Sequence, residues 1–93
     1  MDIITVYGVD FRADTIPVFG ANLLLIQGKK GMLGCGYLNL GTAEKLNHAL
    51  AIVSGVKNYD DMLAATVKEC SAAAAALGVK PGMSGADALK IMQ

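Results

Sequence analysis

The first twenty residues alternate a β-forming segment with turn-forming residues. Residues 2–9 mix Ile, Thr, Val and Tyr, which favour a half-buried pleated strand. Residues 10–14 are mostly polar and predict a turn after this strand. Pro17 and Gly20 restrict the next segment to an edge strand or a loop, because proline cannot donate to a central ladder. The N-terminus therefore predicts a strand, a turn and an edge segment.

A β-hairpin is predicted next. Residues 22–27 are apolar enough for an inner strand, and residues 28–31 (Gly-Lys-Lys-Gly) form a polar, glycine-bounded connection. Residues 32–40 supply the second strand of the hairpin. Antiparallel sheet should therefore dominate the N-terminal region, and Leu24 or Leu33 should face a core or an interface.

Helical spacing begins after the hairpin. Thr42 is suited to cap a short helix, because its hydroxyl can accept a hydrogen bond from a free backbone amide. The apolar positions of this helix recur every three or four residues: Ala43, Leu46, Ala49 and Leu50. Residues 50–53 are also a compact apolar run with β-branched members, which predicts a buried strand that Gly55 ends.

Two further helices have recognisable N-termini. Asn58 is a candidate N-cap, and Asp60 and Asp61 would follow in the first turn, where the helix dipole favours negative charge. Residues 80–82 (Lys-Pro-Gly) predict a turn, after which Ser84 opens the last helix. Both helices should be short.

Residues 65–77 fit two different structures. Residues 66–69 (Thr-Val-Lys-Glu) match a capping box, which would begin one continuous helix through the five alanines. Alternatively, a short strand ends at Cys70, Ser71 is the N-cap, and the helix runs until Gly78 stops it. Helix propensity favours the first structure.

The composition limits the chain to one domain and predicts self-association. Ninety-three residues can build a single core, so residues 1–93 are expected to form one α+β domain with a largely antiparallel N-terminal sheet and short helices packed on it. Hydrophobic residues make up 54% of the chain before its 11 glycines are counted, and only 17% of residues are charged where about 25% is usual. So small a domain cannot bury that much apolar surface alone, which predicts a homo-oligomer.

The charge pattern and the chain ends narrow the classes of partner. Eight basic and eight acidic residues cancel, so the chain lacks the positive field that a nucleic-acid-binding protein needs. Its apolar runs are far shorter than the roughly 20 residues of a membrane span. Asp2 stands where a signal peptide would carry positive charge. These features predict a cytoplasmic protein with neither a nucleic-acid nor a membrane partner.

Cys35 is the candidate nucleophile. It lies between two glycines, Gly34 and Gly36, which would let a substrate or another backbone approach closely. A reactive thiolate also needs a base, a cation or a helix N-terminus beside it, and the chain contains one histidine, His48. The simpler interpretation is that Cys35 is a small buried hydrophobe.

Gly82, Ser84 and Gly85 are the candidate ligand-binding residues, together with Tyr37. The segment Gly-Met-Ser-Gly opens a helix with free backbone amides and a hydroxyl, an arrangement that can hold a small anion. The structural alternative is a turn followed by an N-cap. The chain shows no spacing of metal ligands and no cofactor motif, so no metal or cofactor is predicted.

The following segments stand in order within residues 22–92: Gly34-Cys35-Gly36-Tyr37-Leu38, Ala51-Ile52-Val53, Gly55-Val56-Lys57, Met62-Leu63, Leu77-Gly78-Val79, Gly82-Met83-Ser84-Gly85 and Ala88-Leu89. In these segments the chain resembles the YunC-like family, the domain of unknown function 1805. This resemblance implies an α+β fold whose N-terminal β-region, about residues 1–40, forms a tetramer. It favours the strand-then-helix structure for residues 65–77, and it implies no activity.

Two functions are therefore considered. The first is a non-enzymatic, homo-oligomeric binding or interaction module, because no His, Cys or acidic residues stand at catalytic spacing. The second is a small-molecule enzyme with a pocket between subunits that uses Cys35 or the helix N-terminus at Ser84.

Overall fold

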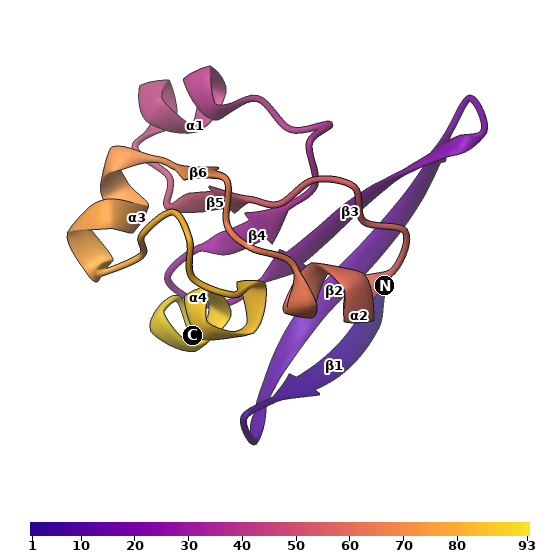
Figure 1. The fold of residues 1–93 in the computed structure, drawn as a ribbon, viewed down its shortest axis with the longest axis horizontal. Helices are drawn as coiled ribbons and strands as arrows, with labels where there is room; N and C mark the ends of the chain where they lie inside the picture. The colour runs from indigo at the N-terminus through magenta and orange to yellow at the C-terminus, as the bar shows by residue number, and fades with distance from the viewer.

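Six strands form one sheet in chain order, β1 to β6, in a computed structural model that describes residues 1–93 (Figure 1). The strands are β1 (Asp2–Val6), β2 (Val9–Val18), β3 (Ala21–Gln27), β4 (Met32–Gly34), β5 (Leu50–Ile52) and β6 (Glu69–Cys70). The helices are α1 (Leu40–Leu46), α2 (Tyr59–Ala64), α3 (Ala72–Leu77) and α4 (Gly85–Ile91). All neighbouring strands are antiparallel except β4 and β5, which run parallel and are connected through α1. The predicted α+β fold is confirmed.

The first two hairpin turns correct one prediction of the sequence. Residues 10–14 lie within β2 and not in a turn, because the turn falls earlier, at Tyr7 and Gly8. Both turn residues have positive φ, 51° and 77°, as the tight type I′ hairpin turn requires. Phe19 and Gly20 form the second turn in the same way, with φ of 44° and 79°.

The end of β2 is an edge segment, as its proline predicts. β1 pairs with β2 only up to Ala13, so residues 14–18 are hydrogen-bonded to β3 on one side alone. Pro17 lies in this segment and pairs in register with Asn22. The β2–β3 hairpin extends beyond the body of the domain, and residues 14–23 are called the arm below (Figure 1).

Two boundaries around α1 differ from those predicted. The strand expected over residues 32–40 stops at Gly34, and the helix begins at Leu40 because Asn39, not Thr42, is its N-cap. The Asn39 side chain accepts a hydrogen bond from the amide of Gly41 at 2.7 Å. Asn47 then ends the helix in the left-handed conformation, so Ala49 lies beyond the helix and Leu50 begins β5.

Residues 65–77 form a strand followed by a helix, as the family resemblance favoured. β6 ends at Cys70, Ser71 caps α3, and Gly78 stops it with a φ of 110°. The buried Ser71 hydroxyl accepts from the amide of Leu50 at 2.9 Å and donates to the carbonyl of His48 at 2.7 Å. A continuous helix would lose these bonds to Leu50 and His48, so tertiary contacts override helix propensity here.

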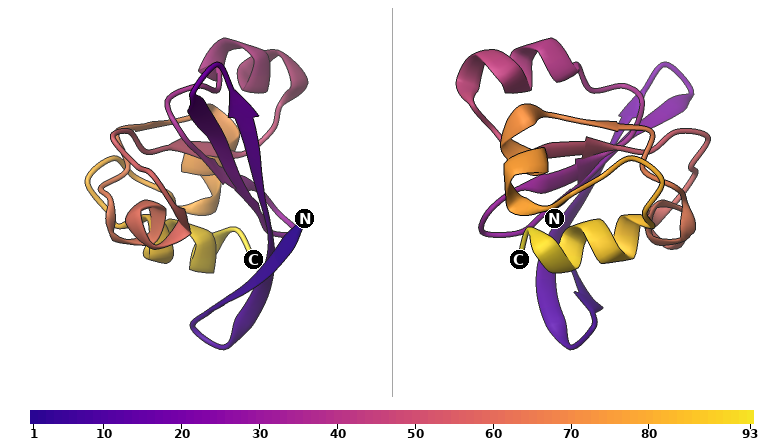
Figure 2. Two further views of the ribbon diagram at one scale, coloured as in Figure 1. Left: turned by 90° about the vertical axis from the view of Figure 1, so that its right-hand side faces the viewer. Right: turned by 60° about the vertical axis from the view of Figure 1, so that its left-hand side comes forward.

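The two faces of the sheet are covered unequally. One face carries the main core, which includes Phe11, Leu24 and Leu33 and is covered by α2, α3 and α4 (Figure 2). Both leucines expected at a core or an interface thus lie in the core of the chain itself. The opposite face is covered by α1 only over β4 and β5, where Leu50 and Ile52 form a smaller cluster with Ala43.

Candidate functional site

An apolar stripe runs along the uncovered face of β2 and β3. Residues paired across antiparallel strands share a face, and alternate residues along a strand face opposite sides. Because Leu24 and Ile26 point into the core, their neighbours point to the opposite face. The residues of this outer face that are apolar and at least partly exposed are Ile16, Val18, Ala21, Leu23 and Leu25. Ile16, which pairs with Leu23, is 52% exposed.

An apolar groove of about 260 Å³ continues this stripe toward α1. Leu25 belongs to both, so the groove begins where the arm joins the body. No Asp, Glu, Lys or Arg side chain lines it, which makes it suited to an uncharged, mainly apolar occupant. The residues that line the groove are Leu25, Met32, Tyr37, Leu38, Asn39, Thr42, Ala43, Leu46, His48 and Leu50.

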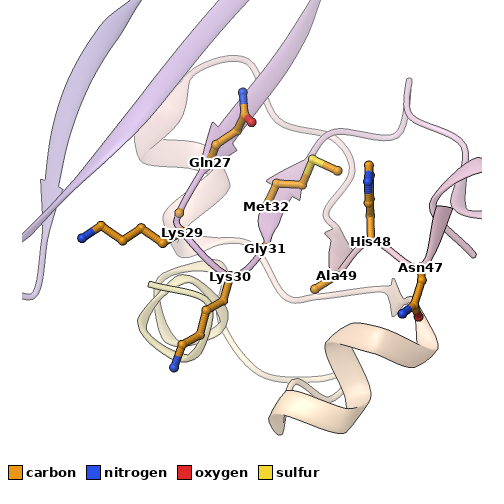
Figure 3. Close-up of a pocket in the computed structure, with 9 residues that line it drawn as sticks. Gln27, Lys29, Lys30, Gly31, Met32, Asn47, His48 and Ala49 are labelled. Carbon is orange, nitrogen blue, oxygen red and sulfur yellow. The ribbon is translucent and has the colours of Figure 1, made fainter.

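A second cleft of about 280 Å³ shares Met32 and His48 with the groove (Figure 3). Lys29 and Lys30 line it, but their side chains point in different directions and both point away from His48 (Figure 3). The backbone amide of Lys30 is already bonded to the carbonyl of Met92 at 3.1 Å. The cations of this cleft therefore do not converge on one point.

Cys35 lies directly after β4 and is 5% exposed. Its Sγ accepts a hydrogen bond from the backbone amide of Leu24 at 3.3 Å. The neighbouring Gly34 leaves room for the Leu38 side chain, because a Cβ at Gly34 would overlap it. The missing side chain at Gly34 therefore serves internal packing, and the Cys35 thiol faces the main core.

We expect Cys35 to react slowly with iodoacetamide in the folded protein, because its Sγ is buried and bonded to a backbone amide. Cys70 is partly exposed and serves as the internal control, with faster labelling. Peptide mass spectrometry after short exposure at neutral pH measures both rates. Faster labelling at Cys35 than at Cys70 would restore the nucleophile hypothesis.

The segment from Gly82 to Gly85 uses its polar groups within the chain. The amide of Gly82 donates to Val67 at 2.9 Å, and that of Gly85 donates to Ala65 at 2.8 Å. The Ser84 hydroxyl accepts from Asp87 at 3.1 Å, as an N-cap does. The structure separates the candidate residues: Tyr37 lines the apolar groove, whereas Ser84 and Cys35 do not.

Two tyrosines form polar contacts that the sequence did not indicate. Tyr7 donates to the Asp87 carboxylate at 2.7 Å, and this hydrogen bond, together with the negative charge, raises the pKa of Tyr7. Tyr59 accepts from Thr15 and donates to Asp2, and its pKa is raised chiefly by desolvation. Both contacts join the N-terminal strands to helices, over separations of 80 and 57 residues for Tyr7 and Tyr59 respectively. Pattern analysis cannot detect pairs so distant in sequence.

No three His, Cys, Asp or Glu side chains gather where they could hold a metal ion. None of the helices has both the length and the hydropathy to span a lipid bilayer.

Comparison with known proteins places the chain among proteins without an assigned activity. Residues 34–92 match the model of the domain of unknown function DUF1805. The chain is 31% identical over 90 residues to the uncharacterized protein YunC of Bacillus subtilis, covering 92% of this chain and 89% of YunC. It superposes with a TM-score of 0.93 on the crystal structure of TA1206, a protein of unknown function from Thermoplasma acidophilum. That match has 36% identity and covers 99% of this chain and 90% of the other. Because the family model matches more than half of the chain and YunC is similar along nearly all of it, the protein belongs to the DUF1805 family of YunC-like proteins.

Proposed function

We propose that the protein is a homo-oligomeric binding or interaction module, a tetramer whose subunits associate through the N-terminal β-region. The observation that carries this proposal is the apolar outer face of the arm. Ile16 and Leu23 pair across β2 and β3 on a sheet face that no helix covers. A contiguous apolar patch of this kind on a small protein is typical of an interaction surface.

The composition supports the same proposal. The chain carries far more apolar residues than its core buries, and its exposed hydrophobic side chains include Ile3, Ile16 and Phe19 of the N-terminal strands and turns. Subunits that covered one another here would remove this surface from water, at about 25 cal/mol for each Å² buried. Self-association therefore offers the simplest stable state for these strands.

The polar side chains favour a binding module over an enzyme, because they form structural contacts within the chain. The tyrosine contacts with Asp87 and Asp2 join strands to helices, and the Ser84 hydroxyl caps α4. Both cysteines are free thiols, which suits the proposed cytoplasmic location, where thiols are kept reduced.

The test is the effect of charge on the outer face. We expect Ile16→Lys and Leu23→Lys to convert the wild-type oligomer to smaller species, because each would bury a lysine in the interface. Native mass spectrometry and light scattering on the eluting protein measure the mass. Leu77→Lys is the matched control, since Leu77 is also exposed (41%) but lies on α3, away from the arm.

Circular dichroism must show that both variants remain folded. Ile16→Lys is the more selective of the two, because Ile16 is 52% exposed, whereas Leu23 is half-buried and packs against the main core. A monomeric wild type at all concentrations would refute the proposal. So would Ile16→Lys and Leu23→Lys variants that keep the wild-type mass.

A further inference from the structure

The first two hairpins of the chain share an unusual turn. Each places an aromatic residue before glycine, Tyr7 before Gly8 and Phe19 before Gly20, with positive φ at all four positions. Asparagine or aspartate is the residue favoured at the first of these positions, because bulky side chains are strained in the left-handed region. An aromatic side chain there requires a compensating contact.

Tyr7 makes such a contact within the chain. Its hydroxyl donates to Asp87 at 2.7 Å, and the ammonium of Lys90 lies 5.3 Å from the centre of its ring. Both partners belong to α4. The strained turn at Tyr7 thus anchors the β1–β2 hairpin to the body of the domain.

Phe19 has no equivalent partner in its own chain. Its side chain is fully exposed, at 105% of the reference area, at the tip of the arm. The arm extends away from the core, beyond Ala13, which is the last residue of β2 that pairs with β1 (Figure 1). The Phe19 ring therefore has no binding pocket within its own chain.

The apolar groove has the size and the chemistry of a pocket for one ring. A cavity of about 150 Å³ lined by apolar side chains is enough to hold benzene, and pockets for drug-sized ligands begin at about 300 Å³. The groove lies between these limits at about 260 Å³, and seven of its ten lining residues are hydrophobic. Tyr37 and Leu46 stand among them with 54% and 58% of their surfaces exposed, so the groove is open to an incoming side chain.

We propose that Phe19 of one copy of this chain inserts into the apolar groove of a second copy. The proposal rests on the oligomer proposed above and specifies its contacts. Continuity supports it: Leu25 lies next to the arm on the same outer face and also lines the groove, so an arm laid along the outer face of another subunit is directed toward that subunit's groove. Each groove would then be completed by a residue of the neighbouring chain.

The decisive variant is Phe19→Asn. Asparagine before glycine is a favoured pair for this turn, so the hairpin is retained while the ring is removed. We expect the dissociation constant of the oligomer to rise about tenfold to a hundredfold for each ring lost, as burial of one phenylalanine side chain implies. Sedimentation equilibrium over a dilution series measures it. Leu77→Asn is the control, since Leu77 is also exposed (41%) but lies on α3, outside the N-terminal β-region, and it is expected to leave the dissociation constant within about twofold.

A second experiment locates the ring. The photoreactive residue p-benzoylphenylalanine replaces Phe19, and equal amounts of unlabelled and ¹⁵N-labelled chains are mixed before illumination. We expect cross-links of mixed isotope composition that join position 19 to peptides within residues 25–50. Cross-links confined to one chain, or to the arm of the neighbour, would contradict the proposal.

The outcomes separate this proposal from the one on which it rests. If Phe19→Asn leaves the dissociation constant unchanged while Ile16→Lys dissociates the oligomer, the groove contact is refuted and the oligomer stands. A small molecule that co-purifies with the wild type and remains bound to Phe19→Asn would also refute the groove contact. A wild type that is monomeric at every concentration would overturn both.

Discussion

Gly85→Ala is expected to abolish the native fold or to leave it destabilised by more than about 3 kcal/mol, because it adds a methyl group where backbone already lies. A Cβ at this position would overlap the carbonyl oxygen of Met62 in α2 and approach Leu33 Cδ2 to 2.9 Å. The first neighbour is backbone, which cannot turn aside as a side chain can. α4 would have to separate from α2 and from the sheet.

Gly36→Ala is the matched control for this variant. Its Cβ would meet one atom within 4 Å, Ser54 Cβ at 3.7 Å, and its φ lies outside the left-handed region. We expect its stability to stay within about 1 kcal/mol of the wild type, with a gain if the alanine restricts the unfolded chain. Urea unfolding followed by circular dichroism compares the two variants, and a Gly85→Ala protein as stable as Gly36→Ala would show that the helices do not meet here.

Phe11→Ala is expected to cost about 3–5 kcal/mol of folding free energy, which approaches the whole stability of a domain this small. Phe11 is 2% exposed and packs in the main core, so its removal leaves a cavity as well as a loss of apolar burial. Phe11→Leu keeps most of the apolar volume and should lose clearly less.

Calorimetry or urea unfolding measures this loss at one fixed protein concentration, because the proposed self-association would also contribute to apparent stability. Leu77→Ala is the surface control, with an expected change within about 0.5 kcal/mol, since Leu77 is 41% exposed at the end of α3. Equal losses in Phe11→Ala and Leu77→Ala would mean that Phe11 lies outside the core.

Local signals in the sequence predicted the parts of the fold that local bonds determine. The caps at Asn58 and Ser84 each accept a hydrogen bond from the amide three residues further along the chain, as their residue types indicate. The loop at residues 28–31 was also correctly placed between two strands. The predicted position was wrong for a turn whose first residue is atypical of turns. Tyr7 carries no turn signal, so the polar residues after it were mistaken for the turn.

Long-range contacts determined what the sequence could not predict. Whether residues 65–77 are helix or strand depends on Ser71, whose hydroxyl bonds to Leu50 and His48 more than 20 residues away. The outer face likewise emerges only from the register of β2 with β3. Tyr37, a candidate ligand-binding residue, lines the groove, but the residues that line the groove with it come from β3, β4, β5, α1 and the connections between them. A single sequence does not show which of these segments meet.

Pro17 has a consequence for the kind of assembly that this chain can form. It lies in the stretch of β2 that pairs on one side only, and it removes a hydrogen-bond donor from the unpaired side. A free strand edge is otherwise a template on which identical chains add without limit, as in fibrils. With this gap in its ladder, the arm resists edge-to-edge growth, while its apolar side chains remain able to pack face to face. The proline thereby favours closed assemblies of a few subunits over open-ended filaments.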